Sequence, residues 1–192
     1  MFPATFTALY DACVLYPAPL RDLLLELATS ELFKARWSEQ IHQEWIKNLL
    51  KNRPELDPEC ISRTRELMDQ AVDDCLISGY ESLIDSLSIL PDPKDRHILA
   101  AAIKGRADVI ITYNLKDFPV EVLNRYEIEV QHPDTFIKHI IDLKPEKVCL
   151  AVKIIRRRLR KPQQSTDDYL MTLAKLKLPQ TIEFLANRTE LI

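Results

Sequence analysis

The sequence of 192 residues predicts an α/β fold, a doubly wound parallel β-sheet flanked by helices, with a small helical extension at the carboxyl end. Two short apolar runs, at 7–10 and 109–112, are typical of strands buried on both faces. Amphipathic segments that begin at Ser, Asp or Pro follow them, and strands that alternate with helices form parallel sheets. The length suits one such domain and a small appendage.

The strand at 7–10 is followed by three predicted helices. A periodic apolar run after Pro19 predicts the first, which extends to about residue 29. Ser38 is a suitable N-cap for the second, to about residue 52, and Asp57 followed by Pro58 begins a third, to about residue 75. The first 75 residues therefore contain one predicted strand and three predicted helices.

The middle of the chain predicts two further strands and two helices. Asp92 followed by Pro93 begins a helix that ends at Gly105, where glycine would provide a left-handed stop. The β-branched run at 109–112 follows, and residues 128–130 form another short strand before a helix at 133–142. Strands that are separated by helices in this way point to a doubly wound sheet with right-handed crossovers.

After Pro145 the pattern is helical throughout. One stripe of apolar residues marks a first helix, Ser165 and Asp168 form a capping box for a second, and Pro179 begins a third. The segment 161–165 is the best candidate for a linker. We therefore divide the chain into an α/β domain at 1–142 and a helical extension at 143–192.

Charge is unevenly divided along the chain. Residues 1–144 hold 16 Lys and Arg against 24 Asp and Glu, whereas residues 145–192 hold 10 against 5. The extension is therefore basic and the body acidic. A basic run such as Arg156, Arg157 and Arg158 is compatible with phosphate binding, although cations are also favoured at the carboxyl end of any helix.

Composition excludes several classes of protein. Glycine occurs only twice, which excludes the Gly-rich phosphate loops of dinucleotide-binding and P-loop proteins. The four cysteines are widely spaced, which excludes a zinc ribbon or a dense disulfide framework and favours a reducing compartment. The sequence has no charged leader and no run of about 18 apolar residues. We expect a cytoplasmic protein that does not span a membrane.

Oxygen-bearing side chains follow two of the predicted strands. Asp11 follows the strand at 7–10, and Asn114 and Asp117 follow the strand that ends at Thr112. In a parallel sheet, ligands bind at the carboxyl ends of the strands, near the point where the strand order reverses. If the two strands are neighbours, these side chains converge, although Asp and Asn are also common turn residues after strands.

Helical phase adds two more carboxylates. Asp95 lies at the amino end of the apolar stripe of its helix and should face the sheet, whereas Asp92 is better placed as the helix N-cap. Glu44 shares the apolar side of its own helix, where a carboxylate needs a partner such as Arg36 or Lys47. Asp92 remains an alternative to Asp95.

Several carboxylates in one cleft repel one another unless a cation neutralises them. Oxygen ligands favour a hard ion, so Mg²⁺ or Mn²⁺ is the expected cofactor, and the expected chemistry is metal-dependent hydrolysis of a phosphodiester. The four histidines share no spacing typical of a metal site. Cys13 is expected to be packed and not nucleophilic.

Four segments carry a resemblance to a known family. They are Leu9-Tyr10-Asp11-Ala12, Gln43-Glu44-Trp45, the segment from Asp92 to Ala102, and Thr112-Tyr113-Asn114-Leu115-Lys116-Asp117-Phe118. They resemble the PIN-domain nucleases, and within them the VapC-like toxins of bacteria and archaea. The resemblance covers about residues 5–142, and the helical tail is similar to the appendage of one subset of VapC-like proteins.

The resemblance implies a PIN-like fold and a metal-dependent endoribonuclease that is the toxin of a type II toxin-antitoxin pair. It implies an RNA substrate, a cognate antitoxin and a homodimer. The implied catalytic quartet is Asp11, Glu44, Asp95 and Asp117, with Asn114 as a further or alternative metal ligand. Thr112 or Asn114 would position the ion or the phosphate.

Two alternatives remain open. One is a PIN nuclease of RNA maturation or DNA repair with no antitoxin, and the other is a non-catalytic PIN-like binding module whose acids only cap helices. A haloacid-dehalogenase-like phosphatase fits less well, because its motif needs a second Asp where this chain has Cys13.

Overall fold

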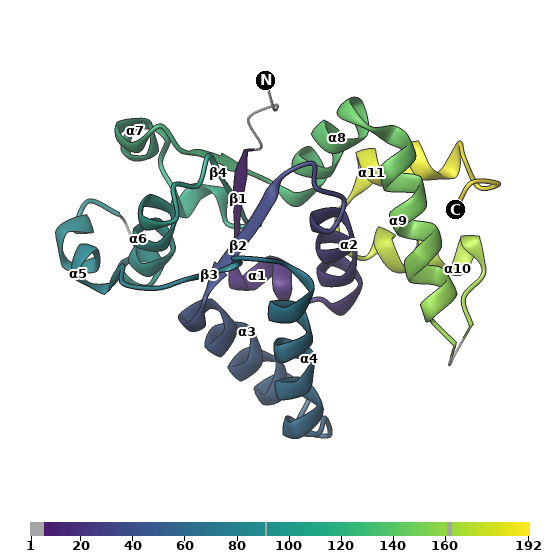
Figure 1. The fold of residues 1–192 in the computed structure, drawn as a ribbon, viewed down its shortest axis with the longest axis horizontal. Helices are drawn as coiled ribbons and strands as arrows, with labels where there is room; N and C mark the ends of the chain where they lie inside the picture. Colours follow the sequence, from purple (N-terminus) through teal and green to yellow (C-terminus); the bar gives the residue numbers. More distant parts are fainter. Residues whose placement is uncertain (1–5, 91, 161–162) are drawn as a thin grey trace.

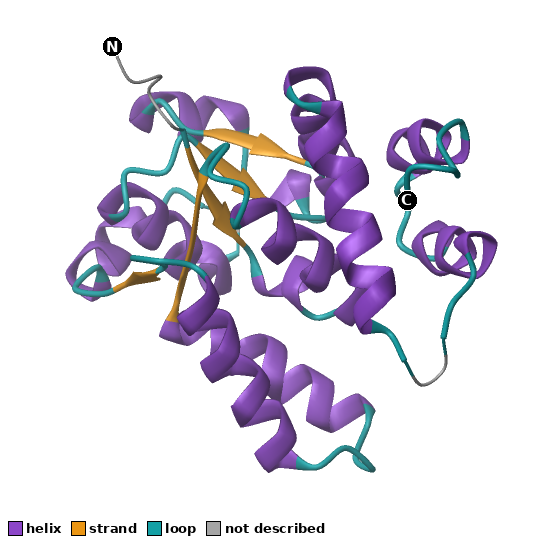
Figure 2. Ribbon diagram, turned by 45° about the vertical axis from the view of Figure 1, so that its right-hand side comes forward, coloured by secondary structure: helices purple, strands orange, loops and turns teal. Residues whose placement is uncertain are grey.

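The computed structural model describes residues 6–90, 92–160 and 163–192. A five-stranded, all-parallel sheet with the order β3-β2-β1-β4-β5 lies at the centre, with helices on both faces (Figures 1 and 2). Its strands are β1 (Thr7–Tyr10), β2 (Lys34–Ser38), β3 (Leu76–Ile77), β4 (Val109–Ile111) and β5 (Glu129–Gln131). The predicted doubly wound α/β fold is confirmed.

Eleven α-helices lie among the described residues. They are α1 (Ala12–Leu15), α2 (Ala18–Ala28), α3 (Glu39–Asn52), α4 (Pro58–Ala71), α5 (Glu81–Ile84), α6 (Arg96–Lys104), α7 (Val120–Leu123), α8 (Pro133–Leu143), α9 (Pro145–Arg158), α10 (Thr166–Ala174) and α11 (Pro179–Ala186). Short 3₁₀ turns precede α6 at Pro93–Asp95 and follow β4 at Leu115–Asp117. Within the described ranges, no helix has the length and apolar character needed to cross a membrane.

The strand order reverses beside β1, which is the central strand. β1 pairs with β2 on one side and with β4 on the other, and Tyr10 lies opposite Ile111. The chain therefore builds β2 and β3 outward in one direction and then returns to build β4 and β5 in the other. The two strands that precede the candidate side chains are therefore neighbours, which meets the condition for those side chains to converge, and the crevice between their carboxyl ends is the usual ligand site of such sheets.

An aromatic cluster fills the core on one face of the sheet. Tyr10 stacks on Trp37 with ring centroids 6.1 Å apart, and Phe33 meets Phe136 of α8 edge to face at 5.0 Å. The Tyr10 hydroxyl donates to the carbonyl of Leu24 in α2 at 3.1 Å, so the buried phenol is satisfied. On the other face, α6 presents small alanines, which allow close packing against the strands.

The predicted helix starts are confirmed by their caps. Ser38 accepts a hydrogen bond from the backbone of Ile41, Asp57 caps α4, and Ser165 forms the predicted capping box with Asp168. The candidate linker at 161–165 lies partly outside the described residues.

The sequence interpretation missed β2 and β3, so the statement that the first 75 residues hold one strand is wrong. β2 alternates charged and buried residues, and its pairing depends on backbone contacts with β1 that are distant in sequence. The third helix also ends at Ala71, four residues before the predicted end, because the backbone becomes extended at Val72 and then enters β3.

Gly105 does not act as a left-handed stop. Its φ is −78°, and the left-handed residue is the following Arg106, with φ 51°. A Cβ on residue 105 would instead collide with the side chain of Ile77 in β3. Glycine is needed there because α6 ends directly against the edge strand.

The three helices of the extension pack beside α2 and α8, on the right of Figure 1. Arg158 of α9 forms an ion pair with Glu26 of α2 at 2.7 Å, and Arg156 donates to the backbone carbonyls of Gln164 and Ile192. Two of the three consecutive arginines therefore stabilise the position of the extension. Arg157 is exposed.

A buried carboxylate joins the domain to the last helix. Asp134, in the first turn of α8, is 3% exposed and accepts hydrogen bonds from the backbone and side chain of both Gln180 and Thr181. These donors lie at the amino end of α11, where the helix dipole also favours a negative charge. The carboxylate therefore caps a helix that is distant in sequence.

We expect Asp134→Ala to lower the free energy of unfolding by about 3 kcal/mol, because it leaves buried donors of α11 unpaired. Asp134→Asn, which keeps one carbonyl oxygen, should cost less. Asp142→Ala removes an exposed carboxylate of the same helix and should change stability by less than about 0.5 kcal/mol. Urea denaturation measures all three, and equal effects of Asp134→Ala and Asp142→Ala would contradict the prediction.

Candidate active site

Four of the oxygen-bearing side chains singled out in the sequence line one pocket of about 360 Å³ at the carboxyl edge of the sheet. Asp11 follows β1, Glu44 comes from α3, Asp95 lies at the start of α6, and Asn114 follows β4. Each reaches the pocket from a different element, so the fold gathers groups that are as much as 103 positions apart in the chain. Asp117 is not among the lining residues.

The carboxylate of Asp11 is held by hydrogen bonds. The hydroxyl of Thr112 donates to its Oδ2 at 2.6 Å, and the thiol of Cys13 donates to the same oxygen at 3.1 Å. Asp11 is 7% exposed and Thr112 is fully buried. Burial and the negative charge of Asp11 raise the pKa of Cys13, which keeps the thiol protonated, so Cys13 packs and donates and does not act as a nucleophile.

Asp95 experiences the charges of the other acids. The pKa of Asp95 is raised to about 6, chiefly by burial and then by the carboxylates of Asp11, Asp117 and Asp92, whereas His97 opposes the shift. Asp117 is therefore close enough to act electrostatically on Asp95, although it does not line the pocket. Asp92 accepts a hydrogen bond from the backbone of Lys94 at 2.9 Å, which is the N-cap role expected for it.

Glu44 is paired with a histidine that the sequence interpretation did not foresee. Nε2 of His97 lies 2.8 Å from Oε1 of Glu44, and the His97 ring is 3% exposed. The expected partners, Arg36 and Lys47, are wrong: Arg36 pairs with Asp74, and Lys47 forms no ion pair with any described residue. His97 follows Asp95 by two residues, and only the packing of α6 on α3 reveals the contact.

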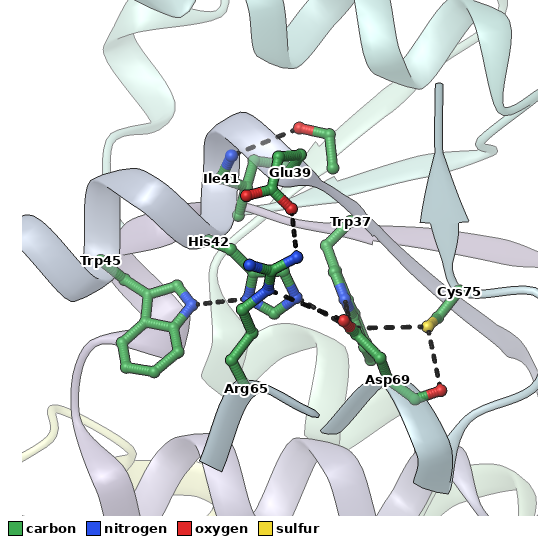
Figure 3. Close-up of polar contacts among 9 residues, drawn as sticks. Trp37, Glu39, Ile41, His42, Trp45, Arg65, Asp69 and Cys75 are labelled. Atoms are coloured by element: carbon green, nitrogen blue, oxygen red, sulfur yellow. Dashed lines mark hydrogen bonds and ion pairs between the residues drawn. The ribbon is translucent and has the colours of Figure 1, made fainter. Parts of the chain in front are cut away.

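A polar network on α3 fixes the helix that carries Glu44 (Figure 3). The indole N–H of Trp45 donates to Nδ1 of His42 at 3.0 Å, so that nitrogen is an acceptor and Nε2 carries the proton. Nε2 then donates to Oδ1 of Asp69 in α4 at 2.8 Å, and the indole of Trp37 donates to the same oxygen at 2.8 Å. The network joins α3, α4 and β2 through one carboxylate.

Sequence reasoning missed two further pocket residues, Asn48 and Asn52. They follow Glu44 at intervals of four residues, so the three side chains form a polar stripe along one face of α3. The amide of Asn52 donates to the hydroxyl of Tyr16 at 3.2 Å, which closes the pocket wall toward α1. The spacing was visible in the sequence, but asparagines on a helix are ordinarily solvated.

The donor set of the pocket fits a hard divalent ion. The ligand groups gathered there are carboxylate and amide oxygens, and burial together with the neighbouring carboxylates raises the pKa of Asp95. The described residues contain no group of three His, Cys, Asp or Glu side chains that would hold a metal as they stand. Mg²⁺ requires no such group, because it keeps several waters and binds through one or two carboxylates.

A larger cavity of about 600 Å³ lies away from these acids, between α2, α4 and α9. Its walls are mainly apolar, and its charged groups include the paired Glu26 and Arg158. It gathers no comparable set of oxygen ligands and is a weaker candidate for phosphodiester chemistry.

Comparisons with known proteins agree with this site. The family model described as PIN domain matches residues 7–116, a segment that contains Asp11, Glu44, Asp95 and Asn114. The chain belongs to the PIN domain family. A second model, described as VapC50 C-terminal domain, matches residues 133–187 and so covers α8 and most of the extension.

One curated relative of this PIN domain protein is named "Putative ribonuclease VapC50" and comes from Mycobacterium tuberculosis. It is 47% identical over 68 residues, which cover 35% of this chain and 39% of the relative. The match therefore spans less than two fifths of the relative's length. No solved structure matches the chain significantly.

We expect His42 to make stability depend on pH. Burial lowers the pKa of His42, although Asp69 and Glu39 oppose the shift and Arg65 adds to it. As pH falls through about 6.5, the unfolded chain binds a proton before the folded one does, so the free energy of unfolding decreases. His42→Gln removes this contribution and should show a shallower decrease between about pH 8 and about pH 5.5.

Urea denaturation at a series of pH values measures the slope. His139→Gln is the matched control, because His139 is exposed on α8 and should leave the slope unchanged. Identical slopes in the wild type and His42→Gln would contradict the prediction, because they would show that the pKa of His42 is not lower in the folded protein than in the unfolded chain.

Proposed function

We propose that this protein is a metal-dependent endoribonuclease that hydrolyses RNA phosphodiesters with Mg²⁺ or Mn²⁺, and that it is the toxin of a type II toxin-antitoxin pair. The observation that carries the proposal is the pocket in which Asp11, Glu44, Asp95 and Asn114 meet. The PIN domain match and the ribonuclease name of the relative support the same reaction.

Asp11 and Asp95 would hold the ion, with Glu44 and Asn114 as further oxygen ligands and Asp117 as a nearby charge. When bound, the ion supplies positive charge that offsets the crowding of the carboxylates and the charge that develops on the phosphate. None of the four pocket side chains forms an ion pair with a Lys or Arg among the described residues, so no such cation competes with the metal ion for their oxygens.

The protein's own residues orient these groups. Thr112 fixes Asp11 through a hydrogen bond, and His97 fixes Glu44. Thr112 has no exposed surface, so in this proposal it positions the ion or the phosphate through Asp11 and without direct contact. Asn114 is exposed at the pocket edge and keeps its proposed role in contacting the phosphate or the ion.

The toxin assignment is supported by the match of residues 133–187 to the VapC50 C-terminal domain. It implies an antitoxin partner, action in the cytoplasm where RNA is available, and a homodimer. We also propose that the nuclease domain comprises residues 1–142 and that residues 143–192 are its basic extension. A nuclease of RNA maturation would share the pocket and differ in having no antitoxin.

We expect purified protein to cleave cellular RNA with Mg²⁺ or Mn²⁺ and to lose this activity with a chelator. Asp11→Asn and Asp95→Asn should each reduce the rate by at least about 100-fold, because each removes a charged oxygen ligand. Asp92→Asn is the matched control: it alters a neighbouring acid that caps a helix, and it should retain activity. Gel analysis of the products and mapping of the new ends measure the effect.

Measurements of thermal unfolding and of metal binding distinguish a lost active site from a lost fold. Asp95→Asn should unfold at or above the wild-type temperature, because it relieves repulsion in the pocket. Calorimetry with Mn²⁺ should show binding by the wild type and weakened binding by Asp11→Asn. A wild type that binds no Mn²⁺ and cleaves no RNA would be a non-catalytic module, and unchanged activity in both Asn variants would refute the site.

We expect expression in a bacterial host to arrest growth and Asp11→Asn to abolish the arrest, because a toxin acts through its nuclease site. Co-expression of the small protein encoded beside this chain should restore growth. Colony counts and growth curves measure both effects. RNA cleavage in vitro without growth arrest would favour a nuclease of RNA maturation or DNA repair.

A further inference from the structure

The turn between α10 and α11 contacts the segment that follows β4, next to the proposed active site. The hydroxyl of Tyr113, which lies between Thr112 and Asn114, donates to the backbone carbonyl of Leu176 in that turn at 2.8 Å. Residues separated by 63 positions are thereby joined. The basic extension is thus in contact with the segment that follows β4, beside the acidic pocket.

A further cavity, distinct from the two described above, is lined by both residues of this contact. It has a volume of about 350 Å³, and its walls include Tyr113, Asn114, His132, Lys175 and Lys177. Asn114 lines both this cavity and the acidic pocket. The two cavities therefore adjoin at Asn114, and a polymer bound in the acidic pocket has the basic cavity as its neighbour.

The two lysines are available for a ligand. Lys175 and Lys177 are exposed, and neither forms an ion pair with any residue in the described part of the chain. Arg156 and Arg158, in contrast, are engaged by the carbonyls of Gln164 and Ile192 and by Glu26. The turn therefore places unneutralised positive charge next to the site.

The positive charge of the turn affects the pKa of the neighbouring His132. Burial lowers the pKa of His132, Asp134 opposes the shift, and the charge of Lys177 lowers it further. His132 also meets Tyr113 edge to face, with ring centroids 5.1 Å apart, so the wall between the lysines and Asn114 is aromatic. Aromatic surfaces beside cations are typical of sites for single-stranded nucleic acid.

We propose that the turn between α10 and α11 forms part of the substrate path, in which Lys175 and Lys177 bind backbone phosphates of the RNA next to the scissile bond. The inference rests on the proposed function. An acidic pocket repels a polyanion, so a substrate needs cations close by to remain bound. The extension would supply them from outside the domain that carries the acids.

The test measures binding apart from cleavage. A short single-stranded RNA oligonucleotide is titrated by fluorescence anisotropy with Asp11→Asn protein at several salt concentrations. Adding Lys175→Gln and Lys177→Gln to that protein should weaken binding by about 10-fold. The negative slope of the logarithm of the association constant against the logarithm of the salt concentration should become shallower by about 1.4, the value for two lost phosphate contacts.

Arg157→Gln with Arg160→Gln is the matched control. It removes the same charge from exposed positions of the extension that do not line the cavity, and it should change affinity by less than about twofold. In the active protein, the lysine variant should raise KM and leave kcat unchanged. Both double variants should melt at the wild-type temperature, because all four side chains are exposed.

The outcomes distinguish this inference from the proposed function. A wild type that cleaves RNA, combined with equal salt slopes for the lysine and arginine variants, would overturn only the role of the lysines. A wild type that cleaves no RNA would overturn the proposed function and the role of the turn with it. A selective loss of slope in the lysine variant, with cleavage by the wild type, would establish both.

Discussion

The pairing of β1 with β4 is the constraint on which the site depends. The register that sets Tyr10 opposite Ile111 brings Asp11 beside Thr112, where one short hydrogen bond fixes the carboxylate. Asp95 is then held near this charge by α6, where burial, and after it the neighbouring carboxylates, raise its pKa. Backbone pairing and helix packing together hold like charges close that would otherwise separate.

Part of this arrangement could be predicted from local rules. The positions after two buried strands identified Asp11 and Asn114, and the period of a helix distinguished Asp95 from the capping Asp92. Those rules need only the sequence near each residue. The overall sheet followed from the alternation of strands and helices and is confirmed, whereas the pairing of its two central strands was a condition of the argument that only the structure supplies.

Other features depend on contacts between distant segments and could not be predicted in this way. β2 has charged residues on one side, and its pairing with β1 identifies it as a strand. The partner of Glu44 is His97, which lies on a different helix, and not a cation nearby in sequence. The charge of the extension was evident from composition. Composition does not show which cations are hydrogen-bonded to carbonyls or paired with carboxylates within the fold.

The carboxylate of Asp134 has a consequence for how the chain is made. Its four hydrogen-bond donors all belong to Gln180 and Thr181, which leave the ribosome long after the sheet has been synthesised. Until they emerge, a negative charge in the first turn of α8 has no partner from α11 and must remain hydrated. The helix that contributes Phe136 to the aromatic core can therefore dock fully only after Gln180 and Thr181 have been synthesised, so that packing on this face of the sheet is coupled to the arrival of α11.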